Sequence, residues 1–123
     1  MQNALLAGIG GFVGAALRHV LGGWIARASM GMDFPWGTFL VNLAGCLVAG
    51  LLMAWVTRSG LLTPSLRVLL FTGVLGGFTT FSAFGMETVQ LLQRQEILVA
   101  VFYVLGSVTA ALIAVWIGLA AAR

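Results

Sequence analysis

The chain has 123 residues, of which 61% are hydrophobic and only 7% are charged. A soluble domain of this length needs far more charge on its surface, so the composition excludes a soluble globular protein and indicates a membrane protein. The net charge of +3 comes from six scattered arginines that form no basic stripe, which argues against nucleic-acid binding.

Four stretches of the sequence are long and apolar enough to cross a hydrocarbon core of roughly 30 Å, which takes about 20 helical residues. They are residues 4–25, 37–57, 68–92 and 97–121. Together they use most of the chain and leave only short loops. The sequence therefore predicts a single all-α transmembrane domain over residues 1–123. Because no basic segment precedes the first stretch, we interpret it as a retained helix rather than a signal peptide.

The first predicted helix contains a packing motif and a charge. Gly10 and Gly14 form a GxxxG pair, a spacing that lets another helix approach closely. Arg18 near membrane depth is costly, and is either functional or extends to the interface along its aliphatic stem. His19 stands beside it, but the sequence assigns it no role.

Polar and small residues form a stripe on the second and fourth predicted helices. The stripes recur at helical spacing: Thr38, Asn42, Gly45 and Ala49 on one helix, and Tyr103, Ser107 and Ala111 on the other. Asn42 needs a hydrogen-bond partner in lipid, either on another helix or in something that moves past it. The stripes favour an interior that is partly polar.

The third predicted helix has a weak point in its middle, in the segment GGFTTFSAFG. Gly76 and Gly77 lower helix propensity, and the following Thr79 and Thr80 are β-branched, so the sequence predicts a break at mid-membrane. Irregular backbone at that depth is tolerated only where protein buries it or where it lines a cavity. A break exposes carbonyls that suit a cation and amides that suit an anion.

The residues around this weak point favour an anion. Phe81 and Phe84 project on one face, and the positive edges of their rings can attract an anion without formal charge. The hydroxyls of Thr79, Thr80 and Ser82 add donors that can replace part of a hydration shell. The residues thus predict an anion pathway, and the alternative is a glycine kink with phenylalanines packed in the core.

The arginines specify orientation weakly, because they divide almost evenly between the two sides. One side of the membrane has Arg58, Arg67 and Arg123. The other side has Arg27 and Arg94, and also Arg18 if the first helix presents it there. Since an excess of basic residues in cytoplasmic loops fixes orientation, this balance predicts insertion both ways and antiparallel pairing of two copies. A parallel dimer whose orientation is set by something else is the alternative.

Three segments in the expected order resemble the Fluc (CrcB) fluoride channel family. They are GGFVGAALRH at 10–19, GTFLVNLAG at 37–45 and GVLGGFTTFSAFGMET at 73–88. The fourth helix is similar more loosely, through Tyr103, Gly106 and Ser107. Two departures are His19, where many members have an aromatic residue, and Ala83, where a hydroxyl residue is common.

The resemblance implies an antiparallel, dual-topology homodimer in the cell inner membrane that passively exports fluoride and so lowers its toxicity. It also implies a structural, untransported sodium ion held by backbone carbonyls of Gly76 and Thr79 from both subunits. Phe81 and Phe84 would form the aromatic pair that fluoride passes. The other residues of the implied pathway are Asn42, Tyr103, Ser107, Thr80 and Ser82, with Arg18 toward an aqueous vestibule and Glu87 beyond the break.

Two functions from other classes are the alternatives. A small proton-coupled multidrug exporter of dual topology needs a membrane-embedded carboxylate, yet the first helix has none and the first acid is Asp33 in a loop. A membrane scaffold would use the glycine faces only for packing. One cysteine, one histidine and three scattered acids assemble no catalytic or metal-ligand cluster, so we do not expect an enzyme. The lone Cys46 is interpreted as a packing residue.

Overall fold

The computed structural model describes residues 1–60 and 62–121, and these are almost entirely helical. Four helical spans are long and apolar enough to cross a membrane: α1 (Gln2–Ala28), α2 (Trp36–Ser59), a composite third span over Pro64–Gln93, and α6 (Ile97–Ala121). They confirm the predicted four-span membrane protein. The limits of the domain, 1–123, remain a prediction.

The third span consists of four consecutive pieces: α3 (Pro64–Arg67), η1 (Val68–Leu75), α4 (Gly76–Phe78) and α5 (Phe81–Gln93). The piece η1 is a π-helix, which is wound more widely than the α-helix expected there. A cap fixes where the span begins, since Thr63 Oγ1 accepts a hydrogen bond from Leu66 N at 3.3 Å and Pro64 occupies the first turn. Gly60, with φ of 61°, ends the preceding helix in a left-handed conformation.

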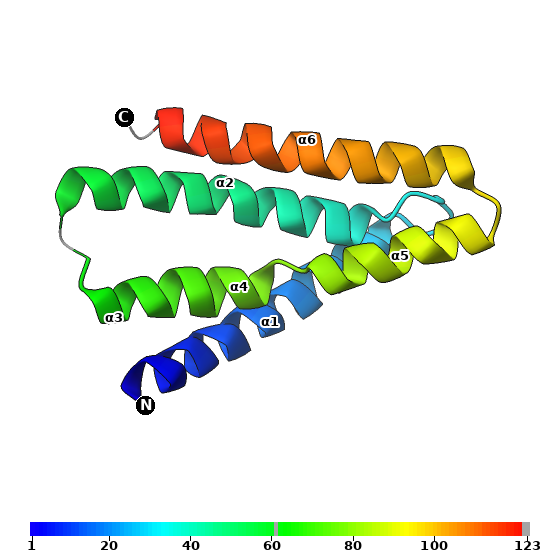
Figure 1. The fold of residues 1–123 in the computed structure, drawn as a ribbon. Coiled ribbons are helices and arrows are strands. Elements are labelled where there is room, and N and C mark those ends of the chain that lie inside the picture. Colours follow the sequence, from blue (N-terminus) through cyan, green and yellow to red (C-terminus); the bar gives the residue numbers. More distant parts are fainter. Residues whose placement is uncertain (61, 122–123) are drawn as a thin grey trace.

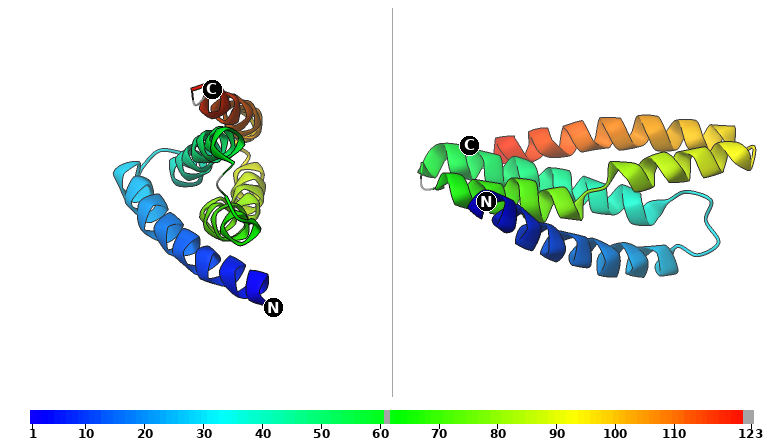
Figure 2. Two further views of the ribbon diagram at one scale, coloured as in Figure 1. Left: turned by 90° about the vertical axis from the view of Figure 1, so that its left-hand side faces the viewer. Right: turned by 60° about the horizontal axis from the view of Figure 1, so that its bottom comes forward.

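The spans are arranged in two closely packed pairs. Helix α2 packs along α6, and α1 packs along η1 and α4, as the ribbon shows from two sides (Figures 1 and 2). Within each pair the helices run in the same direction. The N-terminus and the end of α6 at Ala121 lie at one end of the bundle, whereas the α1–α2 and α5–α6 connections lie at the other (Figure 1).

Glycines allow the backbones of α1 and the third span to touch. Gly10 and Gly14 are buried, and a Cβ at Gly10 would lie 2.5 Å from the carbonyl oxygen of Leu69. A Cβ at Gly14 would overlap the carbonyl oxygen of Val74, and one at Gly77 would overlap that of Gly11. The GxxxG pair therefore lies at a contact within the chain.

Large apolar side chains cover the outside of the bundle. Phe12 is 77% exposed and Trp116 is 72% exposed. Inside, the fully buried Tyr103 joins Leu91 and Ala100 in a small core. A protein with so much apolar surface and so little apolar core is suited to lipid or to a partner chain rather than to water.

Candidate functional site

The third span leaves the helical conformation at two threonines. Helix α4 ends at Phe78, Thr79 and Thr80 are extended with ψ of 154° and 122°, and α5 begins at Phe81. Gly76 and Gly77, to which the sequence analysis attributed part of the weak point, are both still helical. Gly77 serves close packing on α1 instead, because a Cβ there would meet Gly11.

A side chain from α2 holds this extended backbone. Asn42 Nδ2 donates to the carbonyl oxygen of Thr80 at 3.0 Å, and Thr80 N donates to Asn42 Oδ1 at 2.7 Å. Both polar backbone groups of Thr80 are thus satisfied by one carboxamide, which offsets the cost of leaving the helix in an apolar setting. Thr80 Oγ1 accepts a hydrogen bond from Ala83 N at 3.1 Å and caps α5. Asn42 therefore has the interhelical partner that the sequence required.

The same geometry frees two carbonyl oxygens from their helical donors. In a regular helix Gly76 O would accept from Thr80 N, which donates instead to Asn42. Thr79 O would accept from Ala83 N, which donates instead to the Thr80 hydroxyl. These are the two carbonyls for which the resemblance implied a sodium ion.

A cavity of about 270 Å³ lies beside the interruption and brings six predicted site residues together, Thr79 among them. Asn42, Thr79, Thr80, Phe81, Phe84 and Ser107 line it, with Cys46, Val108 and Ala111. Its described lining residues carry no formal charge. We call it the aromatic cavity.

Two features of the aromatic cavity are suited to an anion. The rings of Phe81 and Phe84 lie with centroids 5.5 Å apart. Ser107 Oγ is buried without a hydrogen-bond partner among the described residues. A buried hydroxyl is rarely left unpaired, so this donor is available to a ligand in the cavity.

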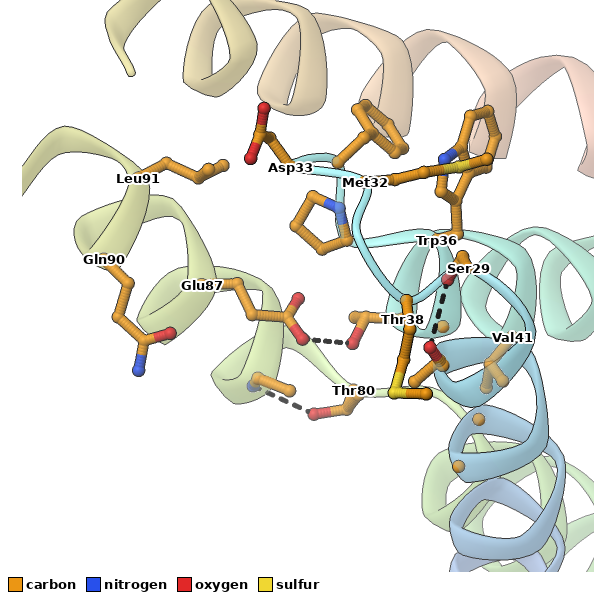
Figure 3. Close-up of a pocket in the computed structure, with 18 of the residues that line it drawn as sticks. Ser29, Met32, Asp33, Trp36, Thr38, Val41, Thr80, Glu87, Gln90 and Leu91 are labelled. Carbon is orange, nitrogen blue, oxygen red and sulfur yellow. Dashed lines mark hydrogen bonds between the residues drawn. The ribbon is translucent and has the colours of Figure 1, made fainter. Parts of the chain in front are cut away.

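A second, larger cavity of about 650 Å³ opens on the other side of Thr80. We call it the charged cavity, because Arg18, His19, Asp33, Glu87 and Arg94 are among its lining residues. Figure 3 shows Glu87 extending from α5 toward Thr38 on α2, while Gln90, one turn further along α5, points away from Thr38. Thr80 lines both cavities, so both border the interruption.

Glu87 connects three spans by hydrogen bonds. Thr38 Oγ1 donates to Glu87 Oε1 at 2.7 Å, and the hydroxyl of Tyr103 donates to Glu87 Oε2 at 2.6 Å (Figure 3 shows the former). Tyr103 is fully buried, and its ring lies 5.1 Å from that of Phe84. Tyr103 therefore packs against the Phe84 ring, and it is not among the described residues that line either cavity.

The Thr38–Glu87 contact was not predicted from the sequence, although two features of the sequence pointed to it. Glu87 is the one acid within the four predicted spans, and Thr38 and Tyr103 were already on polar stripes. The remaining predicted residue, Ser82, lies outside both cavities as the described residues form them, with its hydroxyl 3.3 Å from that of Thr80. Arg123, which entered the charge balance, lies outside the described residues.

The sequence matches a known family over nearly its whole length. The family described as "CrcB-like protein, Camphor Resistance (CrcB)" matches residues 5–119. A Rhizobium etli protein is 46% identical over 123 residues, which is all of this chain and 98% of that one. A Geotalea daltonii protein has the same identity and coverage. A Methylobacillus flagellatus protein is 44% identical over 118 residues, which is 96% of this chain and 92% of its own.

All three relatives are named "Fluoride-specific ion channel FluC". Identity of this level along nearly the full length of both chains confirms the family resemblance that was first seen in three short segments. The four-span bundle is therefore a multi-pass membrane protein, and the chain belongs to the CrcB family.

Proposed function

We propose that this chain forms a fluoride-specific ion channel that passively exports fluoride from the cytoplasm across the cell inner membrane and so lowers fluoride toxicity. The names of the full-length relatives support this function. The observation that carries it is the aromatic cavity, in which a ring pair and an unpaired buried hydroxyl meet without a formal charge among the described lining residues.

The route begins in the charged cavity and continues past Thr80 into the aromatic cavity. Arg18 attracts the anion toward the mouth. Fluoride then exchanges water for neutral donors: the Ser107 hydroxyl, the ring edges of Phe81 and Phe84, and the second N–H of Asn42 Nδ2. Contacts of this kind favour the ion enough to admit it and bind it weakly enough to release it.

The assembly that we propose is an antiparallel homodimer whose third span is broken at mid-membrane. Phe81 is 83% exposed in the single chain although it lines the aromatic cavity, so one chain leaves that cavity open. A second copy would close it against lipid and give two pathways. The near balance of arginines at the two ends of the bundle supports insertion in both orientations.

The proposed dimer has a sodium site at its axis, formed by the carbonyl oxygens of Gly76 and Thr79 from both copies. The fit is supported by the two donors, Thr80 N and Ala83 N, that turn away from these oxygens. Neutral carbonyl oxygens suit a monovalent hard cation better than calcium or magnesium, which usually recruit carboxylates. A bound sodium ion would supply a fixed positive charge that holds the two interruptions together, and it would not be transported.

The test of the function is ion efflux from liposomes that contain the purified protein. We expect fluoride to leave rapidly without a proton gradient, whereas chloride stays at the rate of protein-free vesicles. Fluoride efflux no faster than in protein-free vesicles would remove the proposal. Efflux that required an opposing proton gradient would favour a coupled transporter over a channel.

A further inference from the structure

The ionisable side chains that line the charged cavity balance one another. Arg18 and Arg94 contribute two positive charges, and Asp33 and Glu87 contribute two negative charges. The fifth group is His19, which is exposed on α1 at the same cavity. With a neutral imidazole the formal charges of the described lining cancel, and one proton on His19 gives the lining a net positive charge that adds to the attraction of an anion by Arg18.

Two further charged groups lie at this end of the bundle outside the described lining, Arg27 on α1 and Glu96 in the α5–α6 connection, and their formal charges cancel. The segments of the third span that pack against α1, namely η1 and α4, contain no charged residue. On α2, Arg58 belongs to the last turn, at the end remote from the cavity. On α1 itself, Arg27 lies in the last turn, and its guanidinium lies 3.8 Å from the position that a Cβ on the lining residue Gly23 would take, so its charge is balanced by Glu96 and not by distance.

We propose that His19 is a titratable anion-attracting residue at the mouth of the pathway, which makes fluoride conduction faster in acid. Imidazole is the side chain that changes charge near physiological pH. This inference rests on the proposed fluoride channel, and it assigns a role to a residue that the conduction pathway itself does not use.

The size of the effect follows from Coulomb attraction between a protonated imidazole and the ion. For charges about 10 Å apart, an effective dielectric constant between that of water and that of a protein surface gives roughly a two- to tenfold gain in local fluoride concentration. Salt screens such attraction, because the Debye length falls from about 30 Å at 0.01 M to about 3 Å at 1 M ionic strength. The gain should therefore be large at low salt and nearly absent at high salt.

The experiment measures initial fluoride efflux from proteoliposomes at equal internal and external pH, from about pH 8 to about pH 5.5, across the range in which imidazole titrates. Undissociated hydrogen fluoride crosses lipid unaided, so the leak from protein-free vesicles is subtracted at each pH. We expect the wild-type rate to rise about two- to tenfold toward acid at low salt. His19→Gln should stay at the lower rate, and His19→Lys should stay at the higher rate across the range.

The matched control is Gln93→Lys, which adds the same charge at the same end of the bundle outside the described cavity lining. It should keep the wild-type pH response, which separates a local field from a change in membrane orientation. An acid-dependent rise that persists in His19→Gln would assign the effect to other groups and overturn this inference alone, as would a wild-type rate independent of pH. Absence of fluoride flux at every pH would overturn the proposed function as well.

Discussion

At the scale of single residues, the site depends on neutral groups. Ser107 offers a buried hydroxyl, and Phe81 and Phe84 offer ring edges, all without a formal charge. A cationic side chain at this depth would hold an anion too tightly for rapid release, and it would be costly to bury. Among the described residues, the arginines Arg18 and Arg94 line the wider charged cavity, and none lines the aromatic cavity.

The phenylalanine pair can be tested by substitutions that keep apolar bulk. Phe81→Ile and Phe84→Ile remove the positive ring edges, so we expect each to lower fluoride efflux by about tenfold, the equivalent of roughly 1.4 kcal/mol. Size-exclusion chromatography should show that the assembly is unchanged. The matched control is Phe102→Ile, since Phe102 is 64% exposed on α6 outside both described cavities. Wild-type flux in both site variants would leave the rings a packing role only.

The sequence could predict those site residues whose role depends only on their own helix. Phe81 and Phe84 were identifiable because a spacing of three puts them on one helix face. The role of Tyr103 was not, because its hydroxyl points to Glu87 on a neighbouring span. That contact depends on how α5 and α6 rotate against each other, which neither stripe specifies alone. Asn42 was identified as needing a partner, but the partner is a backbone group, which sequence pattern does not mark.

At the scale of elements, contact between backbones positions the third span against α1. Gly73 and Gly10 approach so closely that a Cβ on Gly73 would lie 2.8 Å from the Cα of Gly10. Contacts of this kind depend on dispersion and close fit, since lipid provides no hydrophobic force between helices. The spatial position of the interruption at Thr79 and Thr80 therefore depends on glycine contacts that begin at Gly73, less than two helical turns before it.

A methyl group at this contact should separate the two helices. In Gly14→Ala the added Cβ would overlap the carbonyl oxygen of Val74, so we expect a loss of about 1–3 kcal/mol in unfolding free energy. Thermal unfolding in detergent would measure it. In Gly106→Ala the new Cβ meets no described atom of the chain within 4 Å, so stability should stay equal or rise. Equal losses in the two variants would contradict specific packing at Gly14.

The ends of the spans followed from the sequence far better than the interior of the third one. Hydropathy predicted 97–121 for the last helix, which is Ile97–Ala121 in the structure. Within the third span, glycine propensity indicated the region of the interruption but not its residues. A glycine can stay helical when close packing favours it, as at Gly77, and a threonine can leave the helix when another side chain satisfies its backbone, as at Thr80.

At the scale of the whole molecule, the distribution of arginines leads to a prediction about topology. We expect a C-terminal tag to be found on both sides of the membrane in cells, because neither end of the bundle has a clear excess of positive charge. Adding two lysines to the α1–α2 connection should shift the tag to one side and, for an antiparallel assembly, reduce flux. A wild-type tag confined to one side in a flux-competent protein would contradict antiparallel pairing.

The proposed sodium site gives a second prediction at this scale. If sodium satisfies carbonyls that cost several kcal/mol each when left unpaired in lipid, replacing it by a large organic cation during purification and assay should abolish most fluoride flux. Returning sodium should restore it, whereas an equal concentration of the organic cation should not. Full flux in protein shown to contain no sodium would remove the site and leave the fluoride pathway intact.

The bond between Asn42 and Thr80 has a consequence for how the two positions tolerate mutation. At position 80 the contact uses only main-chain atoms, so any residue with an N–H can keep it, and proline cannot. At position 42 the side chain must place both a carbonyl oxygen and an NH2 group at the distance that the asparagine side chain spans. Aspartate lacks the donor, and the longer glutamine side chain displaces both atoms. Because the Thr80 hydroxyl also caps α5, a saturation library selected for growth in fluoride should return several helix-capping residues at 80 and almost only asparagine at 42.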